Sequence, residues 1–91
     1  MSVTVKIPTQ LRTLTGGAEK VDASGATLAE VIADIDARHP GLKDRLLDDS
    51  GKLRRFVNVY LDDEDVRFLQ GLETQLDEGA RLSIIPAVAG G

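Results

Sequence analysis

The sequence contains neither cysteine nor tryptophan, and its aromatic residues are one tyrosine and two phenylalanines. The missing cysteine excludes disulfides, thiolate nucleophiles and thiolate metal sites. So few aromatic side chains make a base-stacking platform for nucleic acid improbable. Lys and Arg number 11 against 15 Asp and Glu, a net charge of −4, which suits neither phosphate backbones nor anionic membrane surfaces. We therefore expect no nucleic-acid and no membrane partner.

Long apolar runs are also missing. No window approaches the roughly 20 apolar residues of a membrane span, and the N-terminus does not resemble a signal peptide. The chain has 91 residues, of which 42% are hydrophobic and 29% charged, and these proportions are typical of a globular domain. The sequence thus predicts one small, soluble, cytoplasmic domain with an aliphatic core.

Residues that could carry chemistry are few. The single histidine, His39, lies beside Pro40 at a predicted helix end, where it favours interaction with the helix C-terminus over catalysis. The acidic run 62–65 lacks the Gly and Glu that follow at fixed positions in an EF-hand, so a solvated turn is the better interpretation. We predict no metal site and no enzymatic activity for the body of the chain.

The first half predicts a hairpin followed by a helix. Val3, Val5 and Ile7 alternate with polar residues, as in a half-buried strand that Pro8 ends. A shorter alternation over 19–23 follows the Gly16-Gly17 turn and forms the second strand. The helix begins at a Thr27 N-cap with Glu30 completing a capping box, and it ends at 39–41. Its apolar face comprises Leu28, Val31, Ile32 and Ile35, and a short helical turn around 42–47 comes next.

The second half predicts further strands. Residues 56–61 give the strongest strand pattern, 62–65 turn the chain, and 66–68 are expected to return as a brief strand. A last strand over 81–85 is ended by Pro86. Strands separated from one main helix in this order indicate an α+β domain, with the helix packed on one face of a mixed sheet.

The unusual feature is the Gly90-Gly91 end. Glycines have no Cβ, so such a segment can enter a narrow channel in another protein and present only its terminal carboxylate. A carboxylate becomes an acyl donor once ATP converts it into an acyl-adenylate. Attack on this adenylate by a sulfur nucleophile would give a thiocarboxylate, and attack by a lysine amine would give an isopeptide bond. Both outcomes remain open at this point, as does an interaction module in which the tail has no role.

Several segments carry a family resemblance that extends over nearly the whole chain. They are 3–8, 11–17, 26–32, 57–59 and above all 76–91, where an alternating apolar strand leads through Pro86 to Gly91. The chain resembles the MoaD/ThiS sulfur carriers, which are small ubiquitin-like β-grasp proteins. Within that family, segments 55–60, 63–68 and 86–91 are similar to the CysO type.

The resemblance implies a specific chemistry. Gly91 would be adenylated by an E1-like enzyme of the MoeB/ThiF type that uses ATP, and then converted to a thiocarboxylate. The chain would be a protein cosubstrate that binds no cofactor itself. In the CysO type the sulfur passes to an activated serine derivative on a pyridoxal-phosphate cysteine synthase, and a metalloprotease releases the cysteine. Other relatives supply thiosugars, thiamin, molybdopterin or thiolated tRNA.

The resemblance also divides the chain and locates its contacts. We expect a β-grasp domain of four to five strands over 1–86 and a flexible tail over 87–91, in which Val88, Ala89 and Gly90 lead to Gly91. Leu82 and Ile84 should point inward, which leaves Ile85 exposed for docking on the adenylating enzyme. We predict that Pro86 and Pro8 belong to the same partner-binding patch.

Overall fold

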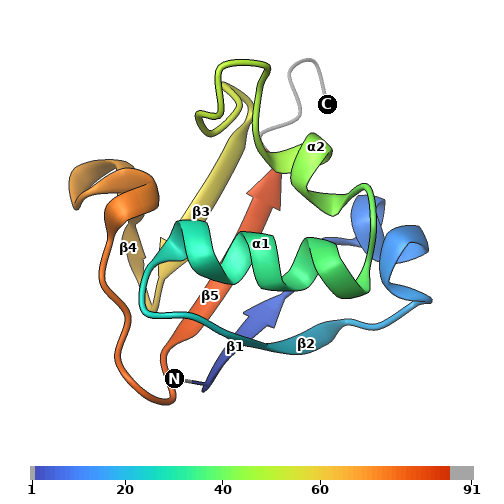
Figure 1. Cartoon of the computed structure of the whole chain (residues 1–91), viewed down its shortest axis with the longest axis horizontal. Helices are drawn as coiled ribbons and strands as arrows, with labels where there is room; N and C mark the ends of the chain where they lie inside the picture. The colour runs from blue at the N-terminus through green and yellow to red at the C-terminus, as the bar shows by residue number, and fades with distance from the viewer. Residues whose placement is uncertain (1, 87–91) are drawn as a thin grey trace.

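Five strands form one mixed sheet in the order β2-β1-β5-β3-β4 (Figure 1). The structure is a computed structural model that describes residues 2–86. The strands are β1 (Ser2–Lys6), β2 (Lys20–Ser24), β3 (Val57–Leu61), β4 (Glu64–Asp65) and β5 (Arg81–Pro86). Strands β1 and β5 are parallel, and the other neighbouring pairs are antiparallel. The β-grasp fold predicted from the sequence is confirmed.

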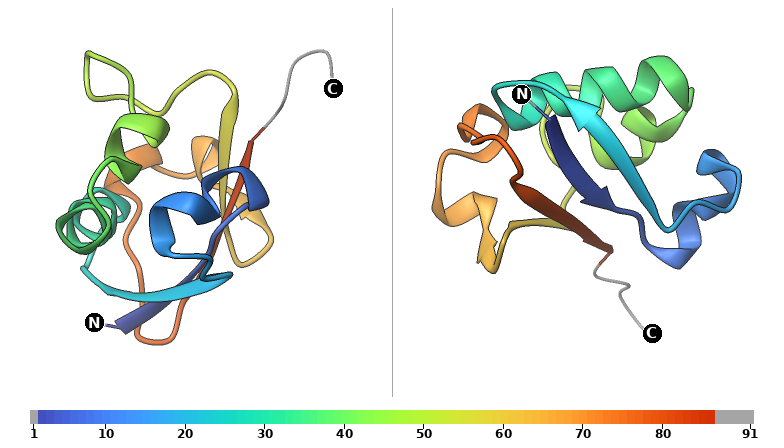
Figure 2. Two further views of the ribbon diagram at one scale, coloured as in Figure 1. Left: turned by 90° about the vertical axis from the view of Figure 1, so that its right-hand side faces the viewer. Right: turned by 90° about the horizontal axis from the view of Figure 1, so that it is seen from below.

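Two α-helices cover one face of this sheet (Figures 1 and 2). Helix α1 (Leu28–Arg38) crosses the strands, and the short α2 (Leu42–Leu46) follows it. Three 3-10 helices lie in the connections: η1 (Thr9–Thr15), η2 (Val66–Phe68) and η3 (Gly71–Glu73). The predicted helix and the helical turn after it are both present.

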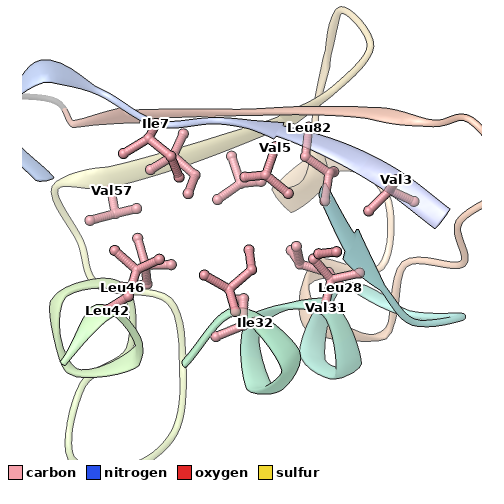
Figure 3. Close-up of a cluster of buried hydrophobic side chains, with 14 of the residues drawn as sticks. Val3, Val5, Ile7, Leu28, Val31, Ile32, Leu42, Leu46, Val57 and Leu82 are labelled. Carbon is pink, nitrogen blue, oxygen red and sulfur yellow. The ribbon is translucent and has the colours of Figure 1, made fainter. Parts of the chain in front are cut away.

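The core lies between the helices and the sheet and is aliphatic. Figure 3 shows side chains of α1 and α2 facing those of β1, β3 and β5. The most completely buried are Val3, Val5, Ile7, Leu28, Val31, Ile35, Leu42, Leu46, Val59, Val66 and Leu82. Neither phenylalanine is buried, so the two largest apolar side chains contribute little to the core.

Helix α1 begins with the predicted cap. The Thr27 hydroxyl accepts from the Glu30 N–H at 3.3 Å, and the Glu30 carboxylate accepts from the Ala26 N–H at 2.9 Å. The first bond satisfies an N–H group that the first helical turn leaves without an internal partner, and the second ties the residue before the N-cap to the helix. At the other end His39 is the C-cap, and its N–H donates to Ile35 O at 2.7 Å. The role assigned to His39 at the helix end agrees with this position.

Two local predictions are wrong. Residues 66–68 form the 3-10 helix η2 and not a strand; the strand that returns along β3 is Glu64–Asp65. The Asp65 carboxylate accepts from the Arg67 N–H at 2.8 Å, and Val66 is fully buried, so the chain turns inward as soon as the pairing begins. Segment 11–17, which matches a loop in the family resemblance, also contains most of the 3-10 helix η1.

Pro86 is the last residue of β5, where the sequence predicted the strand to stop before it. The pairing of β1 with β5 stops at Ser83, whereas the pairing of β3 with β5 continues to Pro86. One side of the final β5 residues therefore has no strand neighbour. A residue without an N–H is tolerated at such an edge position.

Candidate functional site

A groove opens beside the end of β5, where β1 no longer pairs with it. Its volume is about 300 Å³. One wall is the last part of β5, and the other is the segment that leaves β1 and enters η1. The lining residues are Lys6, Ile7, Pro8, Thr9, Gln10, Arg12, Ser83, Ile84, Ile85 and Pro86. The structure thus brings together Pro8, Ile85 and Pro86, the three residues predicted to form a partner-binding patch.

Strand alternation determines which side chains of β5 are available at this groove. Leu82 and Ile84 are 2% and 5% exposed and belong to the core, whereas Ile85 is 48% exposed. The predicted orientation of the strand is confirmed. A half-exposed isoleucine beside two prolines makes an apolar surface that a partner can cover. The docking role of these three residues remains a prediction.

The η1 wall of the groove is held in place by its own contacts. Leu11 is buried against the core, and the Arg12 Nε–H donates to Ile7 O at 3.1 Å. Gly16 ends η1 in the left-handed region, with φ 66°, and this conformation favours glycine. The wall is therefore well defined, and it places the cationic side chains of Lys6 and Arg12 along the groove.

Sequence reasoning missed the η1 contribution to the site. Thr9, Gln10 and Arg12 line the groove, and none of them was among the predicted partner-binding residues. Leu11 follows Pro8 by three residues, a spacing that fits one 3-10 turn returning to the core. That spacing is the signal that would have indicated an ordered wall.

The predicted reacting group and the residues that lead to it lie outside the described residues. The reacting group is Gly91, and the residues that lead to it are Val88, Ala89 and Gly90. The predicted boundary between the domain and the tail, after residue 86, coincides with the end of the described residues. The structure does fix the position from which they continue. Pro86 ends β5 at the open groove, opposite Val57 of β3.

Ionisable groups elsewhere serve the fold. The pKa of Asp34 is lowered, chiefly because its carboxylate accepts from the Ser24 N–H, with Arg38 contributing. The pKa of Asp48 is lowered by hydrogen bonds from the Ser50 hydroxyl and the Lys52 N–H. Within residues 2–86, no three His, Asp or Glu side chains gather as a metal site. In the same range no helix has the length and apolarity to cross a bilayer.

Comparison with known proteins places this geometry in a family. Residues 5–91 match the ThiS family, so the match includes the groove, β5 and the terminal glycines. This chain belongs to the ThiS family. The family assignment agrees with the resemblance drawn from the sequence segments.

Two CysO proteins are similar to this ThiS-family chain over nearly its full length. "Sulfur carrier protein CysO" of Mycobacterium tuberculosis is 56% identical, and the similarity covers 100% of both chains. A chain in the crystal structure of the Amycolatopsis orientalis BexX/CysO complex is 57% identical. That match has a TM-score of 0.92 and covers 98% of this chain and 99% of the other.

A relative of another kind is "Small archaeal modifier protein 3" of Haloferax volcanii. It is 39% identical over 66 residues, which are 72% of this chain and 71% of the relative. Its name refers to modification, whereas the CysO names refer to sulfur transport. The ThiS-family body therefore occurs in proteins named for two different uses.

Proposed function

We propose that this protein is a sulfur carrier whose Gly91 carboxylate is activated and converted to a thiocarboxylate. The observation that carries the proposal is 56% identity to a CysO sulfur carrier along the full length of both chains. The protein acts as a cosubstrate of partner enzymes and is not itself an enzyme.

The proposed chemistry takes place at one carbon atom. A Gly91 carboxylate oxygen attacks the α-phosphorus of ATP and displaces pyrophosphate, which gives an acyl-adenylate. A sulfur nucleophile then attacks the Gly91 carbonyl carbon and expels AMP. When a persulfide delivers that sulfur, reductive cleavage of its S–S bond by a thiol leaves the thiocarboxylate. The chain has no cysteine, so no internal thiol competes for the activated carbonyl.

The proposed activating partner is an E1-like adenylating enzyme of the MoeB/ThiF type, and the ATP belongs to that enzyme. A five-residue segment reaches at most about 17 Å when extended. The catalytic centre of the partner must then lie within that distance of Pro86, so the partner must cover the end of β5. Ile85, Pro86 and Pro8 are proposed to be part of the surface it covers.

The proposed sulfur acceptor is a biosynthetic enzyme. Similarity to the CysO type favours a pyridoxal-phosphate cysteine synthase with a metalloprotease that releases the product. A CysO chain in complex with BexX supports the view that such carriers bind partner proteins directly. A thiosugar, thiamin or molybdopterin pathway is the alternative destination.

The deciding experiment is the intact mass of the protein isolated from sulfur-fed cells, with fragmentation of its C-terminus. We expect Gly91 to carry one sulfur in place of one oxygen. An unmodified acid, even after incubation with the adenylating enzyme, ATP and a sulfur donor, would contradict the proposal. A variant lacking Gly90 and Gly91 is the control, because it should keep the melting temperature of the native chain while losing all modification.

A second candidate function is protein modification, supported by the similarity to Small archaeal modifier protein 3. The activated Gly91 carbonyl would then be attacked by a lysine amine, forming an isopeptide bond and releasing AMP. Proteolytic digests of total cell protein distinguish the two functions. Lysine residues bearing a Gly91-linked remnant would favour the modifier, and thiocarboxylate alone would favour the carrier.

A further inference from the structure

Large apolar side chains are exposed on two segments that adjoin β3, namely the residues before it and η2. Among the described residues, Phe68 is 85% exposed and Phe56 is 55% exposed. Leu69, the residue after Phe68, is also exposed. Phe56 directly precedes Val57, which pairs with Pro86, and Phe68 ends η2 beside β3. Folding does not account for this exposure, because the core is filled by aliphatic residues. Large exposed apolar side chains on neighbouring segments are typical of interaction surfaces.

Arg67 links the two phenylalanine-bearing segments. One guanidinium nitrogen donates to Asn58 Oδ1 at 2.6 Å, and the other donates to Arg54 O at 2.7 Å. Asn58 is the register partner of Ile85, so the guanidinium lies next to the exposed end of β5. We call Arg55, Phe56, Arg67 and Phe68 the Arg67 surface. It adjoins β5 from the β3 side, whereas the groove adjoins β5 from the β1 side.

The Arg67 guanidinium keeps its positive charge available. Both of its acceptors are neutral oxygens, and it uses two of its five N–H groups on them. Asp65 accepts from the backbone N–H of Arg67 and not from its guanidinium. Among residues 2–86, Arg38 and Asp34 form the one ion pair with a nitrogen–oxygen distance below 4 Å. Within that range, neither Arg67 nor Arg55 therefore has a carboxylate within 4 Å.

We propose that the Arg67 surface docks the enzyme that activates Gly91, through an apolar pocket bordered by carboxylates. The inference rests on the proposed function and adds the chemistry of the partner. Aromatic side chains and arginine dominate binding energy at protein interfaces. Because Arg67 is already fixed by two hydrogen bonds, it loses little side-chain freedom on binding. Its place beside β5 lets one partner cover this surface and the end of the strand together.

The test measures the affinity of the purified E1-like adenylating enzyme for three variants of the full chain. Arg55→Glu reverses one charge of the Arg67 surface, and Phe68→Ser removes its most exposed ring. Arg45→Glu is the matched control, because Arg45 is an exposed residue of α2 and the change in net charge is the same. No hydrogen bond of the described residues involves the Arg55 or Phe68 side chain, so both variants should fold, and melting temperatures check this.

We expect Arg55→Glu and Phe68→Ser each to raise Kd at least about tenfold, and Arg45→Glu to change it less than about twofold. Added salt should weaken native binding more than binding of Arg55→Glu. Equal Kd values for all three variants would overturn the proposal. So would a native homodimer that Phe68→Ser dissociates without affecting enzyme binding, because the surface would then serve a second copy.

Failure of the proposed function has a separate signature. If the native chain binds the enzyme but Gly91 is never adenylated with ATP present, the carrier chemistry is wrong. The ratio of Kd values still decides whether the Arg67 surface is where the enzyme docks.

Discussion

Two adjacent isoleucines have opposite environments. Ile84 faces the core and Ile85 faces solvent at the groove, because successive side chains of a strand point to opposite faces. The same chemical group thus contributes to stability at one position and is available to a partner at the next. Substitutions at these two positions can therefore distinguish a side chain that stabilises the fold from one that is available for docking.

The first prediction compares these neighbours. Ile84→Ala should lower the free energy of unfolding by about 2–5 kcal/mol, because it removes buried methyl groups and leaves a cavity. Ile85→Ala should change it by less than about 0.5 kcal/mol but weaken binding to the adenylating enzyme. Urea unfolding and a binding titration measure the two effects. Equal losses of stability would mean that Ile85 is a core residue.

The second prediction concerns acid stability. The Asp34 carboxylate accepts from the Ser24 N–H at 2.9 Å and from Arg38 at 2.8 Å, and its pKa is lowered in the folded state. A lowered folded pKa gives stability that is present above the unfolded pKa, about 3.9, and is lost as pH falls through the folded value. We expect Asp34→Asn to be slightly less stable at neutral pH and to lose less stability between pH 5 and pH 2, measured by unfolding at each pH. Parallel pH profiles for the two proteins would contradict this.

At the level of single residues the sequence predicted part of the site. Strand alternation predicted that Ile85 is exposed, and the family resemblance grouped it with Pro86 and Pro8. Arg67 and Phe68 could not be placed, because their contacts depend on how η2 lies against β3. Alternation indicates which face a side chain takes, but it does not indicate which other segment lies beside it.

At the level of elements, the connection from β2 to α1 is held very tightly. A Cβ added to Gly25 would lie 2.8 Å from Val31 N and 2.9 Å from Glu30 Cβ. Both atoms belong to the first turns of α1, which the core holds through Leu28 and Val31. Glycine is therefore needed for close packing of the connection against the helix.

The third prediction follows from that contact. Gly25→Ala should lower the free energy of unfolding by about 1–3 kcal/mol, because the backbone must shift to accept the methyl group. Gly51→Ala is a useful comparison, since a Cβ there meets no atom within 4 Å and only its positive φ of 83° opposes the change. Chemical denaturation of both variants provides the test. A Gly25→Ala protein as stable as the native chain would show that the connection can relax.

Element prediction was right for the long patterns and wrong for the three residues 66–68. The period of α1 and the alternation of β1, β3 and β5 each extend over several residues, so burial on one face leaves a clear pattern. Residues 66–68 are too few for a period, and their apolar, charged, apolar order fits a strand as well as a single turn. The capping carboxylate of Asp65 decided the outcome in favour of the turn.

At the level of the whole molecule, the two ends of the body meet in the centre of the sheet. Strand β1 lies beside β5, with Val5 in register with Leu82 although 77 residues separate them (82 − 5 = 77). Both side chains are buried. The sequence predicted a mixed sheet but not this pairing, because hydrophobic patterns carry no information about which strands become neighbours.

The fourth prediction uses this central pair. Leu82→Ala should lower the free energy of unfolding by about 2–5 kcal/mol. It should also lower the unfolding midpoint of the entire protein. Far-UV circular dichroism and Tyr60 fluorescence should give the same midpoint, because one core joins the sheet to the helices. Two separate transitions would show that part of the protein unfolds on its own.

The pairing of β1 with β5 has a consequence for synthesis on the ribosome. Strand β5 is made after the other four strands, yet it is the middle strand of the sheet, so β1 and β3 have no common neighbour until β5 has emerged. A nascent or prematurely terminated chain exposes those two strand edges and lacks Ile85 and Pro86 altogether. The surface that enzymes are proposed to recognise is therefore completed only once β5 has joined the sheet. We expect a chain that lacks β5 to take no part in the proposed sulfur transfer, because it lacks this surface.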